Sequence, residues 1–102
     1  MAEHDPTVRR ATYDQVHGGW VRDSSGREVA VGAMPVTVGR ALSSDLRVDD
    51  EAVSAAHCEL RATARGVRLR DLGSTNGTLV GPVAVQDALL LRPCTIRLAT
   101  RS

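Results

Sequence analysis

The chain has 102 residues, of which 42% are hydrophobic and 25% are charged. This length supports one small globular domain with a single core, and the composition excludes a wholly disordered chain. Thirteen basic against twelve acidic residues give a formal net charge of +1. Bulk charge therefore does not predict binding to DNA or to an anionic membrane.

The sequence also argues against a membrane span, a surface for stacking nucleic-acid bases and a metal site. No apolar run approaches the roughly 20 residues of a membrane span, so the sequence predicts a cytoplasmic protein without membrane contact. With one Trp, one Tyr and no Phe, it offers no aromatic platform for stacking bases, so direct nucleic-acid contact is not expected. Cys58 and Cys94 are too widely spaced for a zinc framework, even with His57 nearby, and residues 49–51 are expected to be a solvated acidic corner. We expect no metal and no cofactor.

The order of elements indicates an all-β fold. Residues 1–12 show no periodicity, and order is expected to begin between Tyr13 and Trp20. Residues 1–15 are assigned to a flexible leader before a domain at residues 16–102. Short alternating segments separated by turn formers predict strands, which we place at residues 20–22, 27–31, 36–38, 46–48, 56–62, 67–70, 79–80, 83–85, 89–91 and 94–98. Since no segment carries a sustained helical stripe, the pattern predicts a two-sheet β-sandwich with functional loops at its ends.

Three loop segments concentrate groups that bind oxyanions. Gly39 and Arg40 follow one predicted strand, and the guanidinium of arginine donates forked hydrogen bonds to oxyanions. Ser54 precedes another strand, with His57 three residues later, and its hydroxyl can rotate onto an anion. Residues 73–78, with the sequence Gly-Ser-Thr-Asn-Gly-Thr, are dense in turn formers whose backbone N–H groups can form an anion-binding concavity.

Taken in order, these motifs resemble the forkhead-associated (FHA) family over residues 20–99. The resemblance implies an FHA/SMAD-like sandwich of about ten to eleven short strands that binds phosphothreonine peptides on loops at one end. It implies that the phosphopeptide-binding residues are Arg40, Ser54, Thr75 and Asn76. The residues that it implies to be structural in the loops are Gly39, His57, Gly73, Ser74 and Gly77.

Other interpretations of the same residues stay open. Arg40 can be a surface arginine paired with Asp45 or Asp49, which on position alone would be the favoured interpretation. Asn76 and Gly77 can form a plain hairpin turn, as this dipeptide often does.

Catalysis is not expected. Ser54 and His57 together resemble part of a hydrolase site, but neither a nucleophile elbow nor an oxyanion loop accompanies them. The sequence therefore predicts a non-enzymatic protein.

Two positions depart from the family pattern. Ala55 replaces the Arg, Lys or Asn that usually follows the phosphate-binding serine, so one donor to the ligand is missing unless Arg61, Arg68 or Arg70 compensates. Ala52 replaces a long side chain that often reads the peptide C-terminal to the phosphothreonine. The peptide preference is therefore not predictable from the sequence.

The end of the chain departs as well. Residues 96–99 resemble the penultimate strand of the family, and Ser102 arrives before the expected last strand. An unpaired sheet edge would remain, which can pair with the N-terminal residues or with another chain in a homo-oligomer. We therefore expect the N-terminal piece of a longer protein.

The resemblance implies a phosphothreonine-peptide-binding signalling module whose partner is a phosphorylated substrate of a Ser/Thr kinase. By analogy, it would be the N-terminal sensor or recruitment domain of a bacterial, sigma-54-dependent type of transcription regulator. The alternative is a structural oligomerisation or scaffold domain of the same fold that no longer needs phosphate, for which Ala55 is the warning sign.

Overall fold

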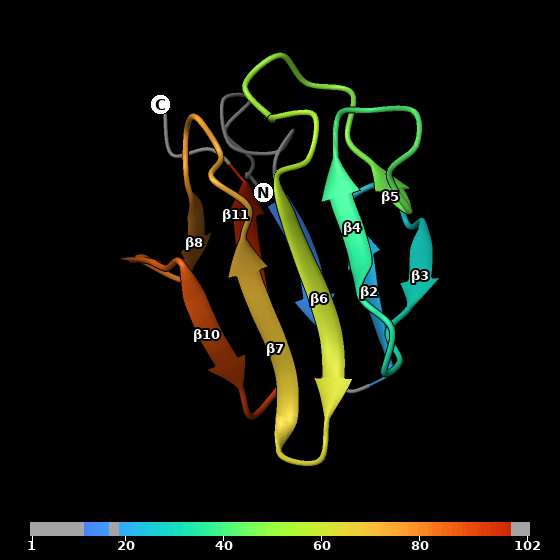
Figure 1. The fold of residues 1–102 in the computed structure, drawn as a ribbon, viewed down its shortest axis with the longest axis vertical. Coiled ribbons are helices and arrows are strands. Elements are labelled where there is room, and N and C mark those ends of the chain that lie inside the picture. Colours follow the sequence, from blue (N-terminus) through green and yellow to red (C-terminus); the bar gives the residue numbers. More distant parts are fainter. Residues whose placement is uncertain (1–11, 17–18, 99–102) are drawn as a thin grey trace.

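The computed structural model describes residues 12–16 and 19–98 (Figure 1). In this part of the chain there are eleven strands: β1 (Thr12–Val16), β2 (Trp20–Asp23), β3 (Glu28–Ala30), β4 (Val36–Gly39), β5 (Leu46–Arg47), β6 (Cys58–Thr63), β7 (Gly66–Asp71), β8 (Thr78–Val80), β9 (Val83–Ala84), β10 (Asp87–Leu90) and β11 (Cys94–Leu98). The predicted all-β fold is confirmed. No helix capable of crossing a membrane occurs among the described residues.

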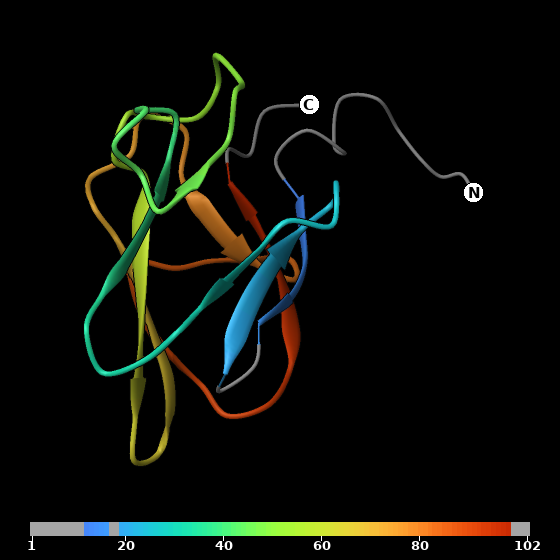
Figure 2. The ribbon, with the colours of Figure 1, turned by 90° about the vertical axis from the view of Figure 1, so that its right-hand side faces the viewer.

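The strands form two sheets that pack face to face (Figure 2). One sheet has the order β3-β2-β1-β11-β8-β9, and the other has the order β10-β7-β6-β4-β5. Neighbouring strands are antiparallel except β4 and β5, which are parallel. The side chains between the sheets that are less than 2% exposed include Val21, Val38, Leu46, Leu60, Leu69, Ile96 and Leu98.

The alternation in the sequence explains why these segments form half-buried strands. In β6, Cys58 and Leu60 are buried, while Glu59 and Arg61 are partly exposed. Strand β7 repeats this pattern and pairs with β6 over six residues. Successive side chains of a strand point to opposite faces, so the apolar set lies on the core and the charged set in solvent.

Strand β1 corrects the predicted boundary of the leader. Residues 12–15, which the sequence analysis placed in the flexible leader, belong to β1, which lies between β2 and β11 and is antiparallel to both. The edge of β11 that the sequence left unpaired is therefore paired with N-terminal residues rather than open. Pairing with two neighbours outweighs the weak local pattern of this segment. Residues 1–11 and 99–102 lie outside the described part of the chain.

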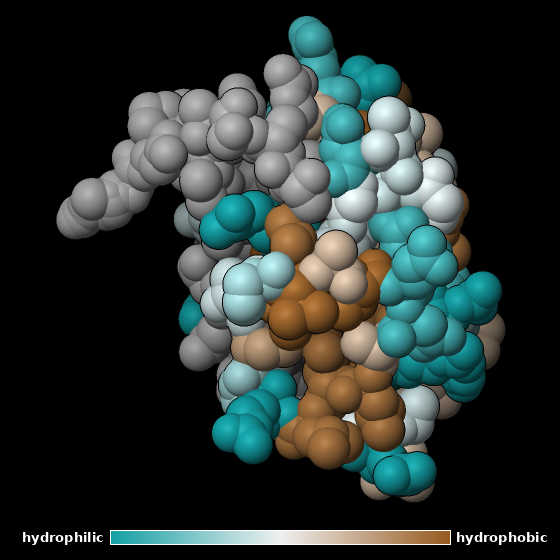
Figure 3. Space-filling view, turned by 90° about the vertical axis from the view of Figure 1, so that its left-hand side faces the viewer, coloured by the Kyte–Doolittle hydropathy of each residue, from teal (hydrophilic) through white to brown (hydrophobic). Residues whose placement is uncertain are grey.

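The side of the molecule formed by β9 and β10 carries an apolar patch flanked by hydrophilic residues (Figure 3). Both strands are sheet edges, and Val83, Leu89 and Leu91 in this region are 58%, 38% and 70% exposed. It is distinct from the end of the sandwich where the loops after β4, β5 and β7 gather (Figure 1).

The loops after β4 and β5 approach each other closely at Gly39. The backbone N–H groups of Arg40 and Ala41 donate to the carbonyl oxygens of Ser54 and Ala55, at 2.9 and 3.1 Å. A Cβ at Gly39 would overlap the carbonyl oxygen of Ala55, which leaves no space for a side chain. The absence of a side chain at Gly39 thus lets the two loops pack against each other.

A buried histidine ties the β5–β6 loop to the β7–β8 loop. His57 is fully buried, and its Nδ1 accepts a hydrogen bond from the backbone N–H of Ser54 at 3.1 Å. Nδ1 therefore carries no proton, and Nε2–H donates to the carbonyl oxygen of Gly77 at 2.7 Å. Burial lowers the pKa of His57, although the bond to Gly77 and the charge of Asp71 act in the opposite direction.

The neutral ring of His57 makes stability depend on pH. Because the folded state lowers the pKa below the ordinary value of 6.5, this contribution is fully present above pH 6.5 and is lost as the pH falls through the folded-state pKa. We expect the urea midpoint to be lower at about pH 5.5 than at about pH 7.5. An NMR titration of the His57 ring that gave a pKa above 6.5 would contradict this account.

Gly39→Ala should destabilise the fold by about 1–3 kcal/mol, because its methyl group must displace the backbone at Ala55. The matched control is Gly32→Ala, since Gly32 has open space where its Cβ would lie and should change stability by less than about 0.5 kcal/mol. Urea unfolding of both variants measures the difference. Equal stabilities for the two variants would show that the close approach at Gly39 is not required.

Candidate functional site

A depression of about 320 Å³ lies between the loops at one end of the sandwich. Arg40, Glu51, Ala52, Val53, Ser54, Ala55, Thr75 and Asn76 line it. The structure thus brings together the four residues predicted to bind phosphopeptide, from three separate loops, while their roles in binding stay predictions. Sequence reasoning did not identify Glu51 or Val53 as part of this surface.

Arg40 has a fixed backbone and an available side chain. Its N–H donates to the carbonyl oxygen of Ser54, and its own carbonyl oxygen accepts from Nε of Arg47 at 2.9 Å. The side chain is exposed, and no hydrogen bond or ion pair joins its guanidinium to another described residue. The pairing with Asp45 or Asp49 considered from the sequence is absent. Asp45 instead accepts from the N–H of Thr37, and Asp49 pairs with Arg47.

Ser54 connects two of the loops while its hydroxyl proton stays available. Its Oγ accepts a hydrogen bond from the backbone N–H of Thr75 at 3.0 Å. A serine hydroxyl can accept and donate at the same time, so the O–H of Ser54 can still donate to an anion. Thr75 is exposed beside it. Three kinds of donor or charge therefore lie around the depression: a guanidinium, a hydroxyl and the polar groups of the β7–β8 loop.

Asn76 makes a second link between the same loops. Its Nδ2 donates to the carbonyl oxygen of Ala52 at 2.9 Å, so the plain hairpin turn considered from the sequence does not describe its contacts. The amide also has a carbonyl oxygen and a second N–H, the two groups needed to bind the backbone of an extended peptide. Ala52 lines the depression but is only 5% exposed, so most of its side chain packs against the core.

The β7–β8 loop is organised by Asp71, which the sequence analysis did not single out. Its carboxylate accepts from the backbone N–H groups of Gly73 and Ser74 and from the hydroxyls of Ser74 and Thr78, at 2.5–3.0 Å. Burial opposes its ionisation, but these hydrogen bonds outweigh burial and lower the pKa of Asp71. The signal was an Asp at the start of a turn-rich segment, where its side chain can accept from N–H groups two and three residues ahead.

Glycine and serine complete this loop. The N–H of Gly77 donates to Oγ of Ser74 at 2.9 Å. Gly77 has φ +89° and Gly73 has φ +79°, a backbone region that a Cβ disfavours. The hydrogen bond of Ser74 and the positive φ angles of Gly73 and Gly77 therefore fix the shape of this loop.

The donor expected at position 55 is not replaced by another arginine. Ala55 lines the depression and is exposed, whereas Arg61, Arg68 and Arg70 belong to β6 and β7 and do not line it. Arg68 pairs with Asp87 at 2.6 Å, and Arg70 pairs with Glu59 at 3.3 Å. Arg40 is accordingly the sole positive side chain among the residues that line the depression.

The contacts of His57 also bear on the hydrolase interpretation. Its two ring nitrogens are hydrogen-bonded to the backbone of Ser54 and Gly77. Neither nitrogen is therefore placed to take a proton from the Ser54 hydroxyl as a general base.

The cysteines form no site in the described residues. Cys58 and Cys94 are free, Cys58 is buried and Cys94 is half-buried. Burial first, and then the charges of Asp71 and Glu59, raise the pKa of the Cys58 thiol, which keeps it protonated and unreactive. No group of three or more His, Cys, Asp or Glu side chains gathers where it could hold a metal ion in the part of the chain described.

Comparison with known proteins identifies sequence relatives. The profile of the FHA domain matches residues 36–99. FhaA of Mycobacterium tuberculosis, described as an FHA domain-containing protein, is 37% identical over 76 residues, which cover 74% of this chain and 14% of FhaA. The chain thus spans a small part of that relative.

Solved structures agree with the fold. A crystal structure of the FhaA FHA domain complexed with the intracellular domain of Rv3910 matches with a TM-score of 0.62 and 28% identity, over 85% of this chain and 99% of that one. A structure from a study of phosphothreonine-dependent FHA domain interactions matches with a TM-score of 0.63 and 27% identity, over 89% and 98% of the two chains. On the sequence match, the fold and the three loop motifs, the chain belongs to the FHA domain family.

Proposed function

We propose that this domain binds phosphothreonine peptides in the depression between its loops and that it is a signalling module rather than an enzyme. The observation that carries the proposal is the guanidinium of Arg40, which is exposed, free of partners among the described residues and adjacent to Ser54, Thr75 and Asn76. An arginine whose backbone is fixed and whose guanidinium has no acidic partner is suited to binding an anionic ligand from solution.

The chemistry of the ligand matches these groups. A phosphothreonine carries a charge of about −1.5 to −2 and three acceptor oxygens. Arg40 would donate a forked pair of hydrogen bonds, Ser54 would donate its hydroxyl proton, and Thr75 would support the phosphate. Asn76 would bind the peptide backbone through its free amide groups. Gly39, His57, Gly73, Ser74 and Gly77 would act only by shaping the loops.

The wider context of the proposal comes from relatives and analogy. The FhaA domain crystallised with an intracellular protein domain, and the structure from work on phosphothreonine-dependent interactions, support a phosphorylated protein as the partner. We extend this to a cytoplasmic bacterial protein that responds to a Ser/Thr kinase, with this domain as the sensor or recruitment part of a sigma-54-dependent type of transcription regulator.

One observation favours the alternative, an oligomerisation or scaffold domain that does not need phosphate. Val83 of β9, Leu89 of β10 and Leu91, which follows β10, are exposed, and an apolar sheet edge can pair with another chain. Sedimentation velocity tests this alternative, which requires a concentration-dependent dimer or larger assembly and fails if the domain stays monomeric.

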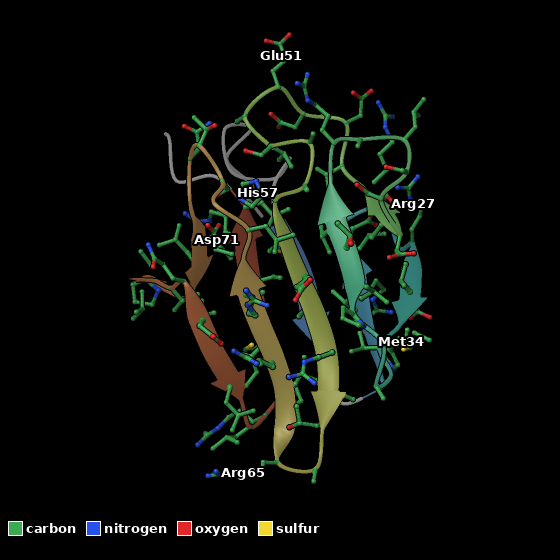
Figure 4. The ribbon with its side chains drawn as sticks, viewed as in Figure 1. Arg27, Met34, Glu51, His57, Arg65 and Asp71 are labelled. Carbon is green, nitrogen blue, oxygen red and sulfur yellow. The ribbon has the colours of Figure 1, made fainter. Side chains whose placement is uncertain are left out.

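Arg40→Ala should weaken binding of a phosphothreonine peptide by about 1.5–3 kcal/mol, or about ten-fold or more, because charged hydrogen bonds to phosphate are lost. The matched control is Arg65→Ala, since Arg65 is an exposed arginine at the opposite end of the sandwich (Figure 4). Isothermal titration calorimetry at two salt concentrations measures both variants. Equal affinity of the wild type for phosphorylated and plain peptide would refute phosphate-dependent binding.

Ala55→Arg should tighten binding of the same phosphopeptide by about ten-fold, because it adds a charged donor at an exposed position of the depression. Ala64→Arg is the control for added charge, since Ala64 lies in the turn between β6 and β7. Fluorescence anisotropy with a labelled phosphopeptide compares the two. A gain of equal size in both variants would show that overall charge, not the depression, controls affinity.

A further inference from the structure

The charged residues that line the depression are of opposite sign. Arg40 is the positive one and Glu51 is the negative one, while the other lining residues are uncharged. A carboxylate beside a site for a phosphate dianion weakens binding of the phosphate alone. The carboxylate contributes favourably to binding only if the ligand also carries a positive group. Glu51 is therefore a candidate for recognising a residue of the ligand other than the phosphorylated one.

Glu51 is held in position by its neighbours rather than by its own side chain. The N–H of Val53 donates to the carbonyl oxygen of Asp50 at 2.9 Å, and the N–H of Ala52 donates to Oδ1 of Asp50 at 2.8 Å. Ala52 and Val53 are 5% and 1% exposed, so they anchor this turn in the core. Glu51 therefore lies at the tip of a fixed turn.

The carboxylate of Glu51 is available to a ligand. Its side chain is exposed and projects from the outermost loop, away from the sandwich (Figure 4). No ion pair or hydrogen bond joins it to another described residue. Asp49 lies in the same acidic segment, but it pairs with Arg47 at 3.5 Å and does not line the depression.

We propose that Glu51 selects phosphopeptides that carry a lysine or arginine near the phosphothreonine and disfavours those with an acidic residue there. This inference rests on the proposed function of the depression. The phosphate would lie against Arg40 and Ser54, and a basic side chain of the same peptide would reach the carboxylate of Glu51. Because Glu51 projects beyond the loop, it would contact a flanking residue and not the phosphorylated one.

The test uses phosphothreonine peptides that are identical except for Lys, Gln or Glu at one flanking position, scanned along the peptide. The wild type should bind the Lys peptide about three- to ten-fold more tightly than the Glu peptide at one or two positions, since exposed ion pairs are weak individually. Glu51→Gln should remove this preference, and Glu51→Lys should reverse it. High salt should reduce the difference.

Asp49→Asn is the matched control, because it removes the same charge from the same segment without altering the lining of the depression. It should keep the preference of the wild type. A preference that survives in Glu51→Gln, or that Asp49→Asn removes equally, would overturn the role of Glu51. If the wild type binds none of the phosphopeptides more tightly than their plain forms, the proposed function itself fails, which is a distinguishable result.

Discussion

The geometry of the site depends on one buried imidazole. His57 accepts a hydrogen bond from the backbone of Ser54 and donates one to the backbone of Gly77, and so joins the two loops that contribute most of the depression. Burying the ring nitrogens without hydrogen-bond partners would cost free energy. The neutral ring therefore stabilises the loop arrangement that supplies both partners. The contacts of Ser54 with Thr75 and of Asn76 with Ala52 repeat the link closer to the surface. The backbones that carry the candidate binding residues are thus fixed by contacts within the domain.

This preorganised site combines a fixed scaffold with few charges. Arg40 supplies its positive charge, Ala55 supplies no donor, and Glu51 opposes an anion. Affinity in such a site would come from a small number of directed hydrogen bonds, and discrimination would come from charge on the ligand beside its phosphate. Two basic side chains of β7 are engaged elsewhere, since Arg68 pairs with Asp87 and Arg70 pairs with Glu59.

The sequence predicted most of the strands, and it predicted that Arg40, Ser54, Thr75 and Asn76 lie together at one end of the sandwich. Alternation in β6 and β7 reports burial directly, because one face of each strand packs on the core. Strand β1 was missed because its pairing with β2 and β11 is non-local and leaves no period in five residues. The contacts of Asp71 and the place of Glu51 beside the depression were missed for a related reason, although the sequence did predict that residues 49–51 are solvated. Both features follow from the folded path of a loop, and the sequence alone does not give that path. The inward packing of Ala52 belongs to the same class.

The most direct test of the central claim is an NMR titration of the domain with a phosphothreonine peptide and with its unphosphorylated form. The account predicts that the phosphorylated peptide shifts the backbone signals of Arg40, Ser54, Thr75 and Asn76 and the guanidinium signal of Arg40, while the plain peptide leaves them unchanged. Shifts concentrated on the β9 and β10 side, or equal shifts with both peptides, would contradict it.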